Sequence, residues 1–268
     1  MAMVLAKLDR ARFHAHEFDA KWDWYYHSGA YRYNMRMDEQ PPHVLRFWWD
    51  LPDRTAEQAR TVSDLSFIYG DMLNNLRGTL DYLVGQLVLL AGNTATDRTG
   101  FPVAKSQQAW MTATGRDVQG VDPRWLDAID SLQPYHDAQP ERHLLAILDH
   151  VNNISKHRRI PASIESIKGF SVGYAHPDMS GRNFQFWEKE PGPIVNGEEF
   201  FNITVDPPIN NPTITRSDPS IRISFIDELD HSDGWDYTNQ ELVQWVADAV
   251  ARFEPAFALP APDMRPKP

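Results

Sequence analysis

The segment 141–161 holds three histidines at intervals of seven residues: His143, His150 and His157. Seven residues are close to two turns of an α-helix, so these side chains would lie along one stripe. Histidine titrates near pH 6.5 and can take up or release a proton in the cell. The stripe is therefore a candidate for general acid–base chemistry, with His157 and His150 as catalytic candidates and Asn153 beside them to orient a ring or a substrate. Three basic residues flank His157 and make the end of the stripe basic: Lys156, Arg158 and Arg159.

The spacing does not favour a metal site on this stripe. Seven residues of helix rise about 10.5 Å, whereas zinc–nitrogen bonds are about 2 Å long. Two such histidines cannot readily share one ion. The sequence contains no His-Glu-x-x-His motif, no Walker loop and no Gly-x-Gly-x-x-Gly motif. We therefore expect no metal and no cofactor at these residues, while a metal held by several distant segments stays open.

The same segment has the pattern of a helix that must position the histidines. Four apolar residues share one face at the helical period: Leu144, Leu145, Leu148 and Val151. Pro140 precedes the segment and Pro161 closes it, and proline is tolerated in a first turn but not in a helix interior. The pattern predicts a helix from Glu141 to Pro161.

A second polar face is expected on a long helix over residues 56–91. Its apolar stripe is continuous, and five residues lie opposite: Asp71, Asn75, Gly78, Tyr82 and Gly85. Asn74 and Asp81 lie on the shoulder of this face. A plain solvent-facing surface is one interpretation, but each interior glycine costs roughly 1 kcal/mol relative to alanine. Close approach of another group to the glycines is the alternative, and it makes Asn74 and Asp81 candidates for substrate binding.

The remaining pattern predicts an α+β fold. A helix over 4–25 precedes a β-hairpin over 31–51, and strands with a period of two follow residue 161 as an antiparallel meander. Capping boxes begin helices at Thr55 and Thr238. We expect long antiparallel helices packed with a sheet made of the hairpin and the meander, followed by a C-terminal helix. Residues 1–255 would form one domain with room for two lobes, and 256–268 a loose proline-rich tail.

The composition restricts the possible binding partners and the cellular compartment of the protein. The net charge of −11 argues against nucleic-acid binding by the whole surface, but leaves room for a local basic patch. The chain has no cysteine, which excludes disulfides and thiolate chemistry and fits a reducing cytoplasm. No apolar run is long enough to span a bilayer, so no membrane partner is expected.

A hydrolase-like pattern occurs at Gly169-Phe-Ser171-Val-Gly173. A nucleophile elbow needs a sharp turn from a strand into a helix. The residues that follow, Tyr174 to Gly181, cannot begin a helix at once. We interpret the pattern as a strand that carries glycines.

Four stretches together resemble a widespread group of uncharacterised bacterial proteins: residues 70–83, Phe101-Pro102, residues 129–135 and residues 144–159. The resemblance covers the layout of roughly residues 1–255. It implies no activity.

The run Asn152-Asn153-Ile-Ser-Lys-His157 also resembles the motif of HEPN domains. These domains are helical bundles, and many are metal-independent ribonucleases that assemble their site across a homodimer. Their motif begins with an arginine, often followed by Asn, Asp or His, and ends with a histidine late in a helix. Asn152 replaces the arginine here, so the resemblance implies that Arg158, Arg159 or Arg77 binds phosphate. Lys156 and Asn152 would lie beside the substrate.

Three functions are compatible with these patterns. The first is HEPN-like phosphodiester chemistry on RNA or a nucleotide, with His157 as the acid–base residue. The second is an enzyme or binding protein for a small metabolite, with a pocket between the histidine helix, the long polar-faced helix and sheet aromatics. The third is a non-catalytic protein that binds a partner. Whether the chain is an enzyme stays open at this point.

Overall fold

The computed structural model describes residues 1–38, 40, 43–157, 164–175, 183–190, 194–206, 213–224 and 238–258. Side chains are described in these ranges except at 156–157, 164–175 and 213–224. The fold is α+β, as the sequence predicts. Contacts divide the chain into two compact units. The helical unit contains Met1–Ala20, Ser66–Ile160 and Trp235–Pro268, and the sheet unit contains Lys21–Leu65 and Pro161–Gly234. The expectation of a single domain over 1–255 stays a prediction.

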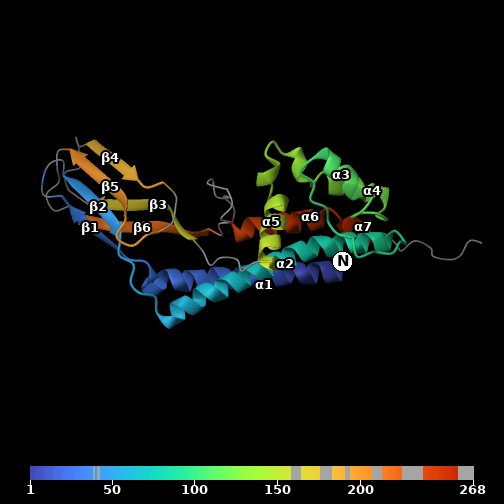
Figure 1. Ribbon diagram of the computed structural model, residues 1–268, viewed down its shortest axis with the longest axis horizontal. Coiled ribbons are helices and arrows are strands. Elements are labelled where there is room, and N and C mark those ends of the chain that lie inside the picture. The colour runs from blue at the N-terminus through green and yellow to red at the C-terminus, as the bar shows by residue number, and fades with distance from the viewer. Residues whose placement is uncertain are drawn as a thin grey trace, which may run out of the picture. The chain divides into compact units, whose positions relative to one another are not determined.

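Two long helices run antiparallel to each other (Figure 1): α1, Ala2–Tyr25, and α2, Ala56–Leu90. In the helical unit, Phe18 of α1 packs on Tyr69 of α2 with ring centroids 5.8 Å apart. Further along, Lys7 lies over the ring of Tyr82 at 5.1 Å. Both helices bury the apolar stripes that their sequences predict, so the pairing follows from hydrophobic periodicity.

The ends of α2 follow local sequence signals. The Thr55 amide donates to the Gln58 side chain at 2.9 Å, and the Gln58 amide donates to the Thr55 hydroxyl at 3.1 Å. This is the predicted capping box. At the other end Gly92 has a φ of 77°. Its N–H donates to the carbonyl of Leu89, and the N–H of Asn93 donates to the carbonyl of Val88. These two bonds form a Schellman motif, which requires the left-handed backbone that glycine adopts easily.

The two interior glycines of α2 have different surroundings. A Cβ at Gly78 would lie 3.2 Å from Nζ of Lys7, so this glycine accommodates the lysine that covers Tyr82. A Cβ at Gly85 would meet no atom of a described residue within 4 Å. The prediction of close approach is confirmed at Gly78, whereas at Gly85 the described residues give it no support.

We therefore expect Gly85→Ala to raise the free energy of unfolding by about 1 kcal/mol through helix propensity alone. Gly78→Ala should give a smaller gain, because the end of the flexible Lys7 side chain must move aside. Urea denaturation of both variants measures the difference. A loss of stability in Gly85→Ala would show that this face is covered after all.

The other helices of the helical unit are shorter. They are α3, Gln107–Thr114; α4, Pro123–Asp130; the 3₁₀ turns η2, Pro134–His136, and η3, Pro140–Arg142; α5, Leu144–His157; α6, Asn239–Ala251; and α7, Glu254–Ala258. The predicted start of the histidine helix at Glu141 is too early, since η3 precedes α5 there. Its predicted end at Pro161 lies outside the described residues. Thr238 and Glu241 form the second predicted capping box, at the start of α6.

The C-terminal region is helical further than its composition suggests. Helix α7 extends to Ala258, and Ala256 is buried. The first residues of the predicted loose tail, 256–258, thus belong to a helix, whereas residues 259–268 lie outside the described part of the chain. No described helix combines the length and apolar character that crossing a bilayer requires.

The sheet unit contains a four-stranded antiparallel sheet in the order β1-β2-β5-β4. Its strands are β1, Tyr33–Met37; β2, Val44–Trp49; β4, Asn183–Glu188; and β5, Glu199–Asp206. Helix α1 leads into β1 through a short π-helical turn, η1, Tyr26–Ala30. The predicted hairpin and part of the predicted meander therefore share one sheet, because β5 pairs with both β2 and β4.

The last strand departs from a simple meander. Strand β6, Thr213–Ser224, pairs with β3, Ile164–Ala175, in a separate two-stranded sheet and is not a neighbour of β5. The hydrolase-like pattern at Gly169–Gly173 lies inside β3. It is part of a strand, as predicted, and does not form an elbow.

Candidate functional site

Helices α2 and α5 are joined by an arginine, Arg77 of α2. Its guanidinium pairs with Asp81 one turn later at 3.1 Å and with Asp149 of α5 at 3.6 Å. Nη2 also donates to the carbonyl oxygen of Phe101 at 2.6 Å. The Arg77 side chain is only 14% exposed. Two residues singled out from the sequence thus lie next to the predicted histidine helix: Asp81 from the polar face of the long helix, and Arg77 as a candidate phosphate ligand.

The same pair fixes the segment that follows α2. Asp81 Oδ1 accepts from the Phe101 amide at 2.9 Å, so Arg77 and Asp81 hold both backbone groups of Phe101. The Phe101 side chain is buried. A Cβ at Gly100 would lie 3.1 Å from Asp81 Oδ1, which explains the glycine at this position. These contacts give Arg77 a structural role, and its role in binding a substrate stays a prediction.

Asn152 of α5 lies in the core of the helical unit. Asn152 is 1% exposed and shares the core-facing side of the helix with Leu145 and Leu148. Within the described part of the chain, neither Nδ2 nor Oδ1 of Asn152 has a hydrogen-bond partner. Residues three apart are neighbours on a helix, so Asn152 lies beside Asp149 and hence near the Arg77 contact. The Nη1 atom of Arg77 is likewise buried and without a hydrogen bond to any described residue.

An unsatisfied buried amide is expensive. Leaving such a donor or acceptor unpaired costs about 1–3 kcal/mol. Leucine has nearly the same shape and would remove that cost. A hydrogen bond from the Asn152 amide to a group outside the described part of the chain would offset that cost.

We expect Asn152→Leu to raise the free energy of unfolding by about 1–2 kcal/mol. A loss of activity in the same variant would identify the amide as functional. Asn153→Leu is the matched control for stability alone, because Asn153 is exposed and bonds through Nδ2 to Asp149 at 3.2 Å. Chemical denaturation measures both changes, and a destabilised Asn152→Leu would mean that the amide has a partner.

The three histidines of the predicted stripe have different surroundings. His150 is half-buried on α5. His157 is the last residue of α5, and its side chain lies outside the described set together with that of Lys156. Arg158 and Arg159 also lie outside the described residues. Asn74 of α2 is exposed.

His143 has a structural role that its spacing did not reveal. Its Nδ1 accepts from the Leu145 amide at 3.1 Å, and its carbonyl accepts from the Ile147 amide at 3.0 Å. His143 is thus the N-cap of α5. Its ring also lies edge-on to Trp245 of α6, with centroids 5.4 Å apart. Burial lowers the pKa of His143, against the opposing effect of Asp137.

This cap predicts a pH dependence of stability. The neutral ring caps the helix, and protonation of Nδ1 removes the acceptor. Since the folded pKa is lowered, the stabilisation is present above the unfolded pKa of histidine, near 6.5, and is lost as the pH falls through the folded value. His143→Asn keeps a capping oxygen without a titrating ring. Its urea midpoint should fall less than that of the wild type between neutral and mildly acidic pH, and equal falls would contradict this.

The sequence analysis did not identify every residue of the Arg77 cluster. Asp149 was not a candidate, because no local signal links a residue of α5 to Arg77 of α2. Only the pair of Arg77 and Asp81 could have been predicted from the sequence, because residues four apart on a helix are neighbours. Among the described residues, no group of three His, Asp or Glu side chains could hold a metal ion.

The chain matches no family model, no curated protein and no solved structure in the comparisons made.

Proposed function

We propose that this protein is a HEPN-like enzyme that cleaves phosphodiester bonds in RNA or a nucleotide without a metal, with His157 as the acid–base residue. The proposal is supported most by the environment of Asn152. This residue occupies the first motif position, and its buried amide has no partner in the described part of the chain. The motif also lies at the end of a helix within a helical unit, as in HEPN domains.

Metal-independent cleavage of RNA uses a nucleophile that the substrate carries. The 2′-hydroxyl attacks the adjacent phosphorus and its proton passes to a base. The bond from phosphorus to the 5′-oxygen breaks, and that oxygen takes a proton from an acid. The products are a 2′,3′-cyclic phosphate and a 5′-hydroxyl. His157 would supply one of these proton transfers, and Asn153 or His150 would orient the reacting groups.

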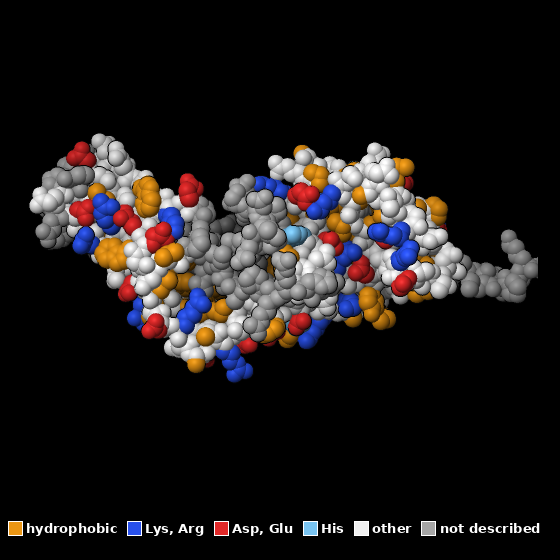
Figure 2. Space-filling view, in the orientation of Figure 1, with side chains coloured by type: hydrophobic (Ala, Val, Ile, Leu, Met, Phe, Trp, Pro, Cys, Tyr) orange, Lys and Arg blue, Asp and Glu red, His pale blue; other side chains and the backbone are white. Residues whose placement is uncertain are grey.

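Binding of the phosphate falls to the basic end of α5 in this proposal. Arg77 already has carboxylate partners on both sides, Asp81 and Asp149. Lys156 and Arg158 are therefore the preferred phosphate ligands. Figure 2 shows lysine and arginine side chains mixed with acidic ones on the face drawn, which favours a local contact with the substrate over a broad basic surface. By the HEPN resemblance we propose a homodimer, and the cysteine-free sequence supports a cytoplasmic location.

Cleavage of a mixed-sequence RNA oligonucleotide by the purified protein tests this function. We expect cleavage that persists in EDTA and yields cyclic-phosphate ends. An oligonucleotide with 2′-deoxy sugars should remain intact, because it lacks the nucleophile. Absence of cleavage, a requirement for added metal, or equal cleavage of the deoxy substrate would each overturn the proposal.

A small-metabolite ligand is the second candidate. It is favoured by the buried Arg77 Nη1 and the buried Asn152 amide, neither of which has a hydrogen bond to a described residue. Arg77 pairs with Asp149, and Asp149 is a helix neighbour of Asn152. Neutral polar metabolites that raise the melting temperature of the wild type but not of Asn152→Leu would support it.

A further inference from the structure

One face of the four-stranded sheet carries a row of polar and aromatic side chains that the proposed function does not use. We call it the polar sheet face and define it by seven residues: Arg36, Asp38, Arg46, Trp48, Trp187, Glu199 and Asn202. Asn202 of β5 lies opposite Arg46 of β2 and opposite Trp187 of β4. Residues directly opposite in an antiparallel pair project to the same side. The row therefore crosses the sheet.

A β-bulge creates this face. The register between β2 and β5 shifts after Phe47, which pairs with Phe201, so that Trp48 pairs with Glu199. The extra residue, Phe200, is fully buried and stacks on Trp49 at 4.3 Å. Two consecutive phenylalanines thus enter the core. Glu199 and Asn202 both project to the other face, where the Asn202 amide donates to Glu199 at 2.6 Å.

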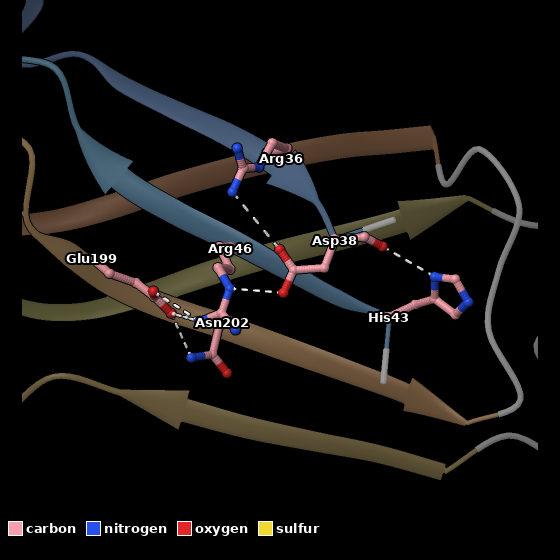
Figure 3. A network of polar contacts seen from close by, with 6 residues as sticks. All are labelled: Arg36, Asp38, His43, Arg46, Glu199 and Asn202. Carbon is pink, nitrogen blue, oxygen red and sulfur yellow. Dashed lines mark hydrogen bonds and ion pairs between the residues drawn. The ribbon is translucent and has the colours of Figure 1, made fainter. Parts of the chain in front are cut away.

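The polar groups of this face hold one another in place (Figure 3). Arg46 donates through Nη1 to both oxygens of Glu199, at 3.1 and 3.0 Å, and through Nε to Asp38 at 3.0 Å. The hydrogen bonds to Glu199 and then Asp38 raise the pKa of Arg46. Arg36 approaches Asp38 at 4.0 Å. Two arginines and two carboxylates balance, so the face is fixed and without net charge.

Two indole rings lie on either side of these groups. Trp48 is on β2 and Trp187 on β4, the two neighbours of β5. Trp187 is 47% exposed and Trp48 is half-buried. Within the described part of the chain, neither side chain has a ring, cation–π or hydrogen-bond contact. The other aromatic rings of the sheet pack on one another, as Phe47 does on Phe201 at 5.8 Å.

We propose that the polar sheet face binds a neutral oligosaccharide. The CH-rich face of a sugar ring stacks on an indole, and its hydroxyls find donors and acceptors in Arg46, Asn202 and Glu199. These groups are already ordered, so binding requires little reorganisation. The balanced charge matches a neutral ligand. A surface that binds single-stranded RNA needs an excess of positive charge to contact the phosphates of the RNA backbone. The residues of the polar sheet face do not supply that excess.

Isothermal titration of the full chain with cellohexaose, maltohexaose and chitohexaose tests the proposal. We expect at least one to bind at millimolar concentrations or below, and Trp187→Ala to weaken its binding about tenfold. Trp24→Ala is the matched control, because Trp24 is 43% exposed on α1, outside the sheet. Circular dichroism verifies folding of both variants.

Three results would overturn it: no heat with any of the three sugars, equal binding by the wild type and Trp187→Ala, or equal weakening by Trp24→Ala. Binding of a single-stranded RNA that Trp187→Ala removes, without sugar binding, would assign the face to nucleic acid. None of these outcomes depends on RNA cleavage, so the proposed activity and this surface can fail separately.

Discussion

Replacement of Arg77 by alanine is expected to lower the free energy of unfolding by about 2–3 kcal/mol. The arginine is 14% exposed, and it contacts Asp81, Asp149 and the carbonyl of Phe101. Removal of one partner of a buried ion pair typically costs about 3–5 kcal/mol, because the other charge stays buried without compensation. Here the acids are 37% and 32% exposed, so water can reach them in part and we expect a value below that range.

Two further variants separate charge from geometry. Arg77→Lys keeps the positive charge but loses the planar fork that reaches Phe101 and both acids, so most of the loss should remain. Arg12→Ala removes an exposed arginine whose pair with Asp9, three residues earlier, has side chains 46% and 68% exposed. An exposed pair contributes about 0–1 kcal/mol. Urea denaturation of the three variants gives the comparison, and equal effects of Arg77→Ala and Arg12→Ala would contradict the buried role.

The predictable part of this structure is the part that local rules determine. The capping boxes at Thr55 and Thr238 form as expected, since each needs only a side chain and a backbone amide three residues apart. The same holds for Gly92, whose left-handed backbone ends α2. The helical period of the apolar residues predicts α1 and α2 along almost their whole length, because each helix buries one long apolar stripe.

The structure departs from the sequence-based expectation where a residue has a partner far along the chain. His143 looked like the first member of a catalytic stripe, but its ring caps α5 and moves the start of that helix beyond the predicted Glu141. Strand β5 pairs with β2 across about 150 residues of sequence, and no local pattern specifies that register or its bulge.

At the candidate site, too, the sequence predicts the local structure but not the tertiary contacts. Asn152 and Asn153 were placed on α5 correctly, but their fates differ: one is buried and the other exposed. A helix period assigns faces, and these neighbours lie about 100° apart around the axis. The predicted apolar stripe through Leu145 and Leu148 continues at Asn152, so the period assigns Asn152 to the buried face. Which groups surround its amide depends on the elements that pack against α5, and the sequence does not give their arrangement.

The largest effect is expected at His157. We predict that His157→Ala and His157→Gln each lower the rate of RNA cleavage by about 10²–10⁴, with little change in melting temperature. Histidine exists in both protonation states near neutral pH, which suits it to proton transfer. In the proposed function the basic residues Lys156 and Arg158, adjacent in sequence, would attract an anionic substrate. In this proposal His157 can therefore accept a proton, and it stands in the sequence beside basic residues that would bind the phosphate.

A control separates this role from a plain helix-end histidine. His16→Ala removes an exposed histidine of α1 in the same helical unit and should leave the cleavage rate unchanged. The pH–rate profile of the wild type should show a limb from a histidine-like group, and that limb should be absent from the residual activity of His157→Gln. If both His157 variants fold normally and cleave RNA at the wild-type rate, His157 is structural and the proposed acid–base chemistry is wrong. If they fail to fold, the pH–rate profile of the wild type decides, because a flat profile between mildly acidic and neutral pH is incompatible with a titrating histidine in the reaction.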